Sequence, residues 1–224
     1  MFLIGWSAAQ VPYTINSGFP GYTVPAAPPP VVYYDASAGQ PFPAARQGFS
    51  PPSRRGWLVY GSHVVLRHVE TGKRLHSHEH PYEGGSGQQQ VTGFDGSDDN
   101  DWWVVKGPHG DDAPDGQPLP QNGALRLMHR QTRRNLHSHE IESPCTGQQE
   151  VTCFGDDGEG DENDNWLVVY SGDKLRLVHA MTGKRLHSHG TDLPDWGFGQ
   201  QEVTCFEGED DNDYWQVQEQ RRLD

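Results

Sequence analysis

The tetrapeptide Leu-His-Ser-His occurs three times in this chain, at residues 75–78, 136–139 and 186–189. Each copy is followed by Gly-Gln-Gln-x-Val-Thr, then by an acidic turn that ends in Asn-Asp, and then by a tryptophan. Three motifs that recur in the same order identify an internal repeat. The chain must therefore fold into an architecture that uses one structural unit three times.

Each unit has the alternation of apolar and polar residues that is typical of β-strands. Val64, Leu66 and His68 alternate before the first turn, and residues 125–129 and 175–179 repeat the pattern. Each unit then reads as four short strands with turn signals between them, over about 57–106, 121–170 and 171–217. Residues 107–123 form a polar loop insertion. We predict an all-β protein, a β-trefoil of three four-stranded units.

The apolar residues of the shared motifs are the predicted core. They are the leucine that opens each Leu-His-Ser-His, the valine after each Gln-Gln and the closing tryptophan. We expect all nine to be buried: Leu75, Leu136, Leu186, Val91, Val151, Val203, Trp103, Trp166 and Trp215.

Residues 1–55 differ from the rest of the chain. They hold most of its 17 prolines, and the run Pro-Ala-Ala-Pro-Pro-Pro at 25–30 fits neither a helix nor a central strand. We predict an extended, proline-rich N-terminal arm over 1–55 and a trefoil domain over 56–224. The aromatic residues of the arm are the predicted anchors to a protein partner: Phe2, Trp6, Tyr13, Phe19, Tyr22, Tyr33, Tyr34, Phe42 and Phe49.

The repeated histidines could be metal ligands, because His-x-His on a strand places both rings on one face. A zinc site needs three or four ligands that converge, whereas a threefold repeat spreads these residues apart. We expect instead that each ring bonds the backbone at a tight turn and packs on the tryptophan of its own unit. No metal or cofactor is predicted.

The acidic turns and the Gly-Gln-Gln segments have structural interpretations as well. The turns, around Asp98, Asp161 and Asp210, lack the spacing of a calcium loop, so we expect solvated turns with Asx caps. A pair of amides could bind sugar hydroxyls, but its recurrence in every unit favours a shared structural bond. This interpretation disfavours a glycan as the ligand.

Little in the sequence indicates catalysis. The stretch Gly-Gly-Ser-Gly-Gln at 84–88 is not a nucleophile motif between a strand and a helix. Cys153 and Cys205 occupy the repeat position that Gly93 fills in the first unit, which indicates packing rather than a nucleophile. We predict that the protein is not an enzyme.

Composition restricts the partners and the compartment. A net charge of −14 disfavours nucleic acid and anionic membranes, and no apolar run is long enough for a spanning helix. The start of the chain lacks a basic segment, and its apolar run ends after Trp6. We therefore expect a cytoplasmic protein in which Cys145, Cys153 and Cys205 are free thiols.

Taken together, Leu-His-Ser-His, Gly-Gln-Gln-x-Val-Thr and acidic-Asn-Asp-x-Trp resemble the MIR motif over residues 57–217. This motif occurs in protein O-mannosyltransferases, in inositol trisphosphate and ryanodine receptors, and in stromal-cell-derived-factor-2-like proteins. The last group consists essentially of three MIR units and enters the endoplasmic reticulum. The resemblance implies a β-trefoil without catalytic machinery of its own.

Two functions from different classes fit these observations. The favoured one is a structural adaptor of a large, multi-subunit intracellular assembly, which docks through the arm and the trefoil surface. A ciliary axoneme or another part of the cytoskeleton is a candidate location. The alternative is a glycan-binding or chaperone-associated MIR protein of the secretory pathway, located in the endoplasmic reticulum.

Overall fold

The computed structural model describes residues 34–35, 40–41, 56–111 and 113–222. Unit one contains β3 (Ser62–His68), β4 (Arg74–Pro81), β5 (Gln89–Phe94) and β6 (Trp102–Lys106). Unit two contains β7 (Ala124–His129), β8 (Asn135–Glu142), β9 (Gln149–Phe154) and β10 (Trp166–Ser171). Unit three contains β11 (Lys174–His179), β12 (Arg185–Asp192), β13 (Gln201–Phe206) and β14 (Trp215–Arg222). Short 3-10 turns are η1 (Asp99–Asp101), η2 (Glu162–Asp164), η3 (Asp195–Gly197) and η4 (Asp211–Asp213).

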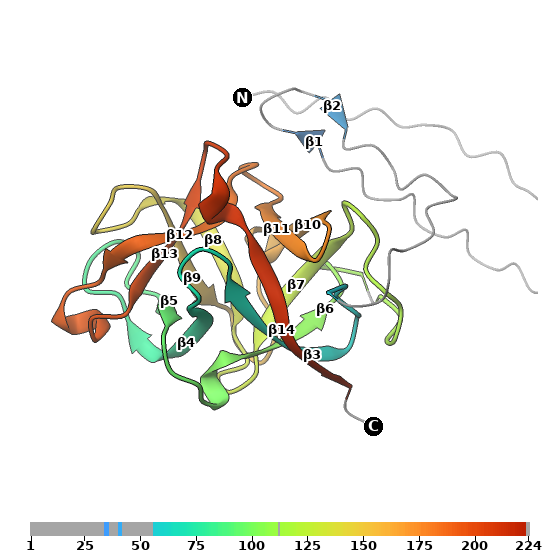
Figure 1. Ribbon diagram of the computed structural model, residues 1–224, viewed down its shortest axis with the longest axis horizontal. Helices are drawn as coiled ribbons and strands as arrows, with labels where there is room; N and C mark the ends of the chain where they lie inside the picture. The colour runs from blue at the N-terminus through green and yellow to red at the C-terminus, as the bar shows by residue number, and fades with distance from the viewer. Residues whose placement is uncertain (1–33, 36–39, 42–55, 112, 223–224) are drawn as a thin grey trace, which may run out of the picture. The chain divides into compact units, whose positions relative to one another are not determined.

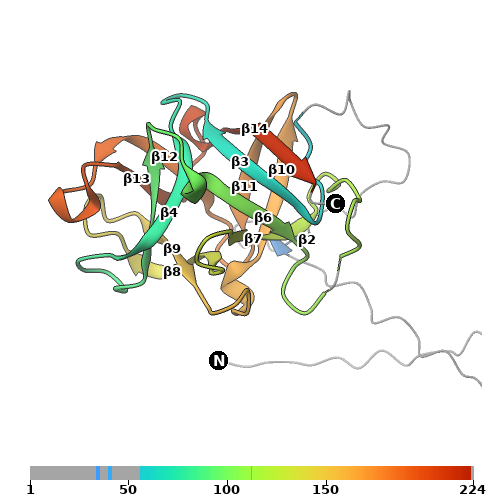
Figure 2. The same ribbon diagram turned by 90° about the horizontal axis from the view of Figure 1, so that it is seen from below.

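The first and last strands of the units form a closed barrel. Strand β3 pairs with β14 and β6, β7 with β6 and β10, and β11 with β10 and β14, all antiparallel. The middle strands form the hairpins β4–β5, β8–β9 and β12–β13, and β5, β9 and β13 also pair with one another. Figures 1 and 2 show these hairpins gathered at one end of the barrel. A six-stranded barrel capped by three hairpins is a β-trefoil, so the predicted fold class is confirmed.

The core consists of the residues that the repeat supplies. All nine predicted residues have no exposed surface. The indole Nε1 of Trp103 donates a hydrogen bond of 2.9 Å to the carbonyl oxygen of Leu75, and Trp166 and Trp215 bond Leu136 and Leu186 in the same way. Each closing tryptophan thus holds the Leu-His-Ser-His strand of its own unit, which explains why the two motifs recur together.

The segment 107–123 differs from the polar loop that we predicted. Its Leu119 is fully buried in the main core beside Leu58, and the Leu119 N–H donates to the Leu58 carbonyl at 2.8 Å. A bridge between Val59 and Pro118 continues this contact. The segment therefore contributes one apolar side chain to the barrel core, a contact that local polarity could not reveal.

Two further strands, β1 (Tyr34–Asp35) and β2 (Gln40–Pro41), form an antiparallel ladder within the predicted arm. The aromatic anchors predicted for the arm lie outside the described residues, except that the backbone of Tyr34 belongs to β1. The division into an arm and a trefoil at residue 55 stays a prediction.

Candidate functional site

The first histidine of each Leu-His-Ser-His copy holds the acidic turn of its unit. The Nδ1 atom of His76 lies 2.9 Å from Oδ1 of Asp101, and both side chains are buried. Asp101 ends η1, while Asp98 caps its start by accepting the Asn100 N–H. The pairs His137–Asp164 and His187–Asp213 repeat this geometry at 2.9 Å. The predicted Asx caps are present, but the partner of this histidine is a carboxylate rather than the backbone.

These groups also form three clusters whose donor atoms lie within 4.8 Å of one another and could hold a metal ion: His76, Asp98, Asp101; His137, Asp161, Asp164; and His187, Asp210, Asp213. In every unit the histidine is hydrogen-bonded to one carboxylate of the cluster, and both carboxylates form the capping box of the turn. Zinc prefers about four ligands and calcium about six to eight oxygens, more than each cluster offers. The clusters are better explained as parts of the repeated turn.

A chain of hydrogen bonds joins each unit to the next. The Nε2 atom of Gln89 donates to Ser77 Oγ at 2.7 Å and to Oγ1 of Thr132, in unit two, at 2.9 Å. Thr132 Oγ1 lies 2.9 Å from His129 Nδ1, and His129 Nε2 lies 3.0 Å from the carbonyl oxygen of Asn100, back in unit one. Gln149 and Gln201 bond Thr182 and Thr71 in the same way. This part of the Gly-Gln-Gln segment therefore makes the shared structural bond that we predicted.

The histidines at the ends of the first strands pack on tryptophans of the preceding unit. The ring centroids of His129 and Trp103 lie 5.2 Å apart, because these residues are register partners in the β6–β7 ladder. The pairs His68–Trp215 and His179–Trp166 repeat the contact at 5.0 and 5.1 Å. The prediction that each ring packs on its own unit's tryptophan is wrong, since a closed barrel pairs each first strand with the last strand of the unit before it.

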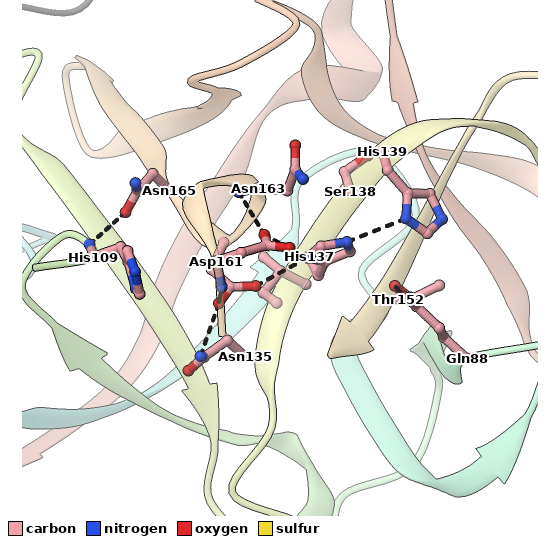
Figure 3. A network of polar contacts seen from close by, with 12 residues as sticks. Gln88, His109, Asn135, His137, Ser138, His139, Thr152, Asp161, Asn163 and Asn165 are labelled. Atoms are coloured by element: carbon pink, nitrogen blue, oxygen red, sulfur yellow. Dashed lines mark hydrogen bonds and ion pairs between the residues drawn. The ribbon is translucent and has the colours of Figure 1, made fainter. Parts of the chain in front are cut away.

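The second histidine of the motif reaches another buried polar group. In unit two, His137 Nε2 lies 3.2 Å from His139 Nδ1, and His139 Nε2 lies 3.3 Å from Oε2 of the buried Glu150. Figure 3 shows His137 between the acidic turn and His139. It also shows Gln88 of unit one beside Thr152, whose hydroxyl donates a hydrogen bond of 2.6 Å to the Oε1 atom of Gln88. Most polar groups of the repeat are thus satisfied within the fold.

A cleft between units one and three departs from this symmetry. It has a volume of about 350 Å³. We call it the 1–3 cleft, and its lining residues are His76, His78, Glu79, His80, Phe94, Asp98, Asn100, Phe198 and Gln200.

Phe198 forms an exposed aromatic rim to the 1–3 cleft. Its side chain is 61% exposed, and its ring lies edge-on to His78 at 5.2 Å and tilted to His80 at 5.0 Å. Its backbone has φ of 58°, in the left-handed region that glycine adopts without strain. An exposed phenylalanine in a strained conformation is an observation that points to function.

Several polar groups of the 1–3 cleft are available to a ligand. In the described part of the chain, no hydrogen bond is made by the side chain of Asn100, by the carboxylate of Glu79 or by the ring nitrogens of His80. Gln200 uses its Oε1 atom to accept from Thr92, and no described residue accepts a hydrogen bond from its Nε2 group. Burial lowers the pKa of His78, with a further contribution from neighbouring His76, so its neutral ring is favoured. The cleft thus combines an apolar face with several donors and acceptors.

Our sequence reasoning did not single out Phe198 or His80, although the repeat contains the signal. Phe198 precedes Gly199 in the place where Ser86 and Thr146 precede the corresponding glycines. The loop from Leu193 to Gln200 is also longer than those over 82–88 and 143–148. Comparison of the three units for their differences, instead of their likeness, would have found this site.

No helix within the described residues is long and apolar enough to cross a membrane. All three cysteines are free; Cys153 and Cys205 are buried and Cys145 is exposed.

The chain is similar to curated proteins and solved structures over the trefoil. It is 53% identical over 115 residues to a stromal cell-derived factor 2-like protein of Dictyostelium discoideum, covering 50% of this chain and 54% of that protein. The chain spans about half the length of the curated relatives that it matches.

Two solved structures share the fold. The crystal structure of the SDF2-like protein from Arabidopsis thaliana is 39% identical, with a TM-score of 0.71, over 75% of this chain and 97% of that one. The structure of the S. cerevisiae protein O-mannosyltransferase Pmt1-Pmt2 complex bound to the sugar donor is 34% identical, with a TM-score of 0.68. It covers 85% of this chain and 28% of the matched chain.

These relatives contradict the favoured sequence interpretation. An adaptor of the axoneme, cilium or cytoskeleton is expected to have structural proteins as relatives. The relatives of this chain are instead stromal cell-derived factor 2-like proteins and a protein O-mannosyltransferase. The argument against a glycan ligand was also wrong. The finding that overturns it is a solved relative, a protein O-mannosyltransferase complex bound to the sugar donor, which is 34% identical to this chain.

The three repeated units also match the sequence pattern of a protein family. The sequence model of the MIR domain matches residues 75–218, from the first Leu-His-Ser-His to the last tryptophan strand. The matched region includes the three hairpins and all three closing tryptophans. This chain belongs to the MIR domain family.

Proposed function

We propose that this protein is a glycan-binding MIR β-trefoil of the secretory pathway, located in the endoplasmic reticulum, and that its 1–3 cleft is the binding site. The single observation that carries the proposal is Phe198, an exposed and conformationally strained aromatic residue at the rim of a polar cleft. The other lining residues give this ring the polar surroundings that a sugar requires.

A pyranose ring has one face of C–H groups and an edge of hydroxyls. The Phe198 ring offers a flat apolar surface for the C–H face. The Asn100 amide, the Gln200 Nε2 group and the Asp98 carboxylate lie in the same cleft and can bond the hydroxyls. Binding sites commonly combine an apolar wall with a few polar groups that fix orientation.

The relatives support both the ligand and the compartment. One solved relative is a protein O-mannosyltransferase complex bound to a sugar donor, and its matched region covers 85% of this chain. The resemblance to stromal cell-derived factor 2-like proteins implies entry into the endoplasmic reticulum, and one such protein is 53% identical over 115 residues, half of this chain. Mannose-containing glycans are therefore the first ligands to test.

We propose binding without catalysis. The Asp98 carboxylate is held in place by the cap of η1, since its Oδ1 atom accepts the Asn100 N–H at 2.7 Å. The deeper His76 is held by Asp101 at 2.9 Å, as are its counterparts in units two and three. The acidic and imidazole groups on this side of the cleft thus have structural partners that the repeat explains.

The test is titration of the full chain with mannose-containing oligosaccharides, followed by calorimetry or NMR shift perturbation. We expect saturable binding that Phe198→Ala weakens at least tenfold, because the stacking surface is lost. Thr146→Ala is the matched control, since Thr146 has the same place in the loop of unit two and lies outside the 1–3 cleft. Absence of binding to any glycan, or equal binding by Phe198→Ala, would reject the proposal.

A further inference from the structure

We infer that the 1–3 cleft selects uncharged sugars and rejects sugars that carry phosphate or carboxylate groups. This inference rests on the proposed function and names the class of glycan. It is drawn from the charges around the cleft, which the family assignment does not specify.

The charged side chains that line the cleft and are ionised at neutral pH are acidic. Glu79 and Asp98 contribute carboxylates, and no lysine or arginine lines the cleft among the residues that the structure describes. Below them lies the buried Asp101, whose carboxylate accepts from the backbone N–H of Asp98 at 3.1 Å and faces His76. An anionic group on a bound sugar would therefore meet carboxylates without a cation to pair with.

The basic residues that precede the Leu-His-Ser-His motif do not line this cleft. Arg74 donates to the carbonyl oxygen of Gly96, and its Nε atom lies 3.9 Å from Asp101. Lys73 lies 3.6 Å from Asp192. Arg74 therefore offsets part of the charge of the buried Asp101. Among the described residues, neither Glu79 nor Asp98 forms an ion pair with a lysine or an arginine, although Asp98 Oδ1 lies 3.7 Å from the ring nitrogen Nδ1 of His76.

The neighbouring cleft between units one and two shows the contrast. It has a volume of about 440 Å³, and its lining includes the cation Arg134 together with Gln88 and Asp156. Glu79 and His80 lie between the two clefts and line both. The repeat thus produces one cleft with an arginine and one without, and the cleft without it has the exposed aromatic rim.

Uncharged hexoses suit the 1–3 cleft because they offer hydroxyls to its carboxylates and carry no anionic group for those carboxylates to repel. Carboxylate oxygens are strong acceptors for sugar hydroxyls, since a hydrogen bond to an ionised group is about twice as strong as a neutral one. The same oxygens repel a phosphate or a carboxylate at close range. Glu79 and Asp98 therefore act as specificity-determining residues, while Phe198 supplies the stacking surface.

The experiment compares methyl α-mannopyranoside with its 6-phosphate on the full chain at pH 7.5, above the range in which histidines usually carry charge. We expect the uncharged sugar to bind at least tenfold more tightly. The double substitution Glu79→Gln and Asp98→Asn should reduce the ratio of the two affinities, and asparagine retains the N-cap of η1. High salt should reduce the ratio in the unmodified protein as well.

The outcomes distinguish glycan binding itself from selection of uncharged sugars. Binding of neither sugar, nor of larger mannosides, would reject the proposed function and this inference with it. Equal affinities, or tighter binding of the phosphate, would reject the inference and leave glycan binding intact. A preference for the uncharged sugar that survives the double substitution unchanged would also overturn it, because selection would then lie elsewhere. The variant Arg134→Gln tests whether the phosphate uses the neighbouring cleft.

Discussion

The Nε2 atom of His129 lies 3.0 Å from the backbone carbonyl oxygen of Asn100, so that the second unit is tied to the acidic turn of the first. The other ring nitrogen, Nδ1, lies 3.4 Å from the Thr132 N–H, which donates to it. One nitrogen therefore donates and the other accepts, which requires the neutral ring. His68 has the same two kinds of partner, while the Nε2 and Nδ1 atoms of His179 each lie 2.9 Å from the Asn163 carbonyl oxygen and the Thr182 hydroxyl oxygen, respectively.

The first prediction is that the trefoil loses stability in mild acid. Burial lowers the pKa of His129 and of His179 from 6.5 to about 4. Above pH 6.5 both rings are neutral in the folded and unfolded chain; between 6.5 and about 4 only the unfolded chain takes up the protons, so stability falls. Each ring contributes on the order of 3 kcal/mol over this window. Urea unfolding at several pH values measures the effect, and a flat profile would contradict it.

The second prediction concerns the links between units. Gln89→Ala should lower the free energy of unfolding by about 1–3 kcal/mol, because it leaves the buried Ser77 hydroxyl and Thr132 hydroxyl each without a donor. Gln149→Ala and Gln201→Ala should cost similar amounts. The exposed Gln131→Ala is the control. Unequal losses in the free energy of unfolding among the three variants would show that equivalent hydrogen bonds contribute unequally to stability.

The third prediction concerns the core. Trp103→Ala should destabilise the trefoil by about 3–5 kcal/mol, because it removes a fully buried indole and leaves a cavity. It also removes the donor to the Leu75 carbonyl. Chemical denaturation gives the value, and a loss below about 1 kcal/mol would contradict the packing described above.

The fourth prediction separates the side chain of Phe198 from its backbone. Phe198→Ala and Phe198→Gly both remove the ring, but only glycine adopts φ of 58° without strain. The glycine variant should therefore be more stable than the alanine variant by about 1 kcal/mol. Equal melting temperatures would show that the loop relaxes once the ring is removed.

The fifth prediction concerns the thiols. Burial raises the pKa of Cys153 and of Cys205 to about 12, whereas Cys145 is exposed. Because the thiolate is the reactive form, iodoacetamide should modify Cys145 alone in the folded protein and all three cysteines after unfolding. Mass spectrometry counts the adducts. Modification of Cys153 before unfolding would show that the β9 strand opens readily.

The repeat in the sequence determined the architecture. The same apolar residues recur at the same positions of every unit, as Leu75, Val91 and Trp103 do in the first. Because each unit must bury these side chains, the repeat specifies a core with threefold symmetry. Caps of the Asp98 type were also predictable, because they depend on contacts within one short segment. These features are local or periodic, so they can be read from the chain.

Only the tertiary structure decided which unit each polar group would bond. Gln89 reaches Thr132 across a unit boundary, and His129 packs on Trp103, because closing the barrel pairs strands from successive units. The 1–3 cleft has the same origin, since it brings His80 and Phe198 together from opposite ends of the trefoil sequence. Contacts between residues so far apart in the chain depend on how the barrel closes, which the pattern within one unit does not contain.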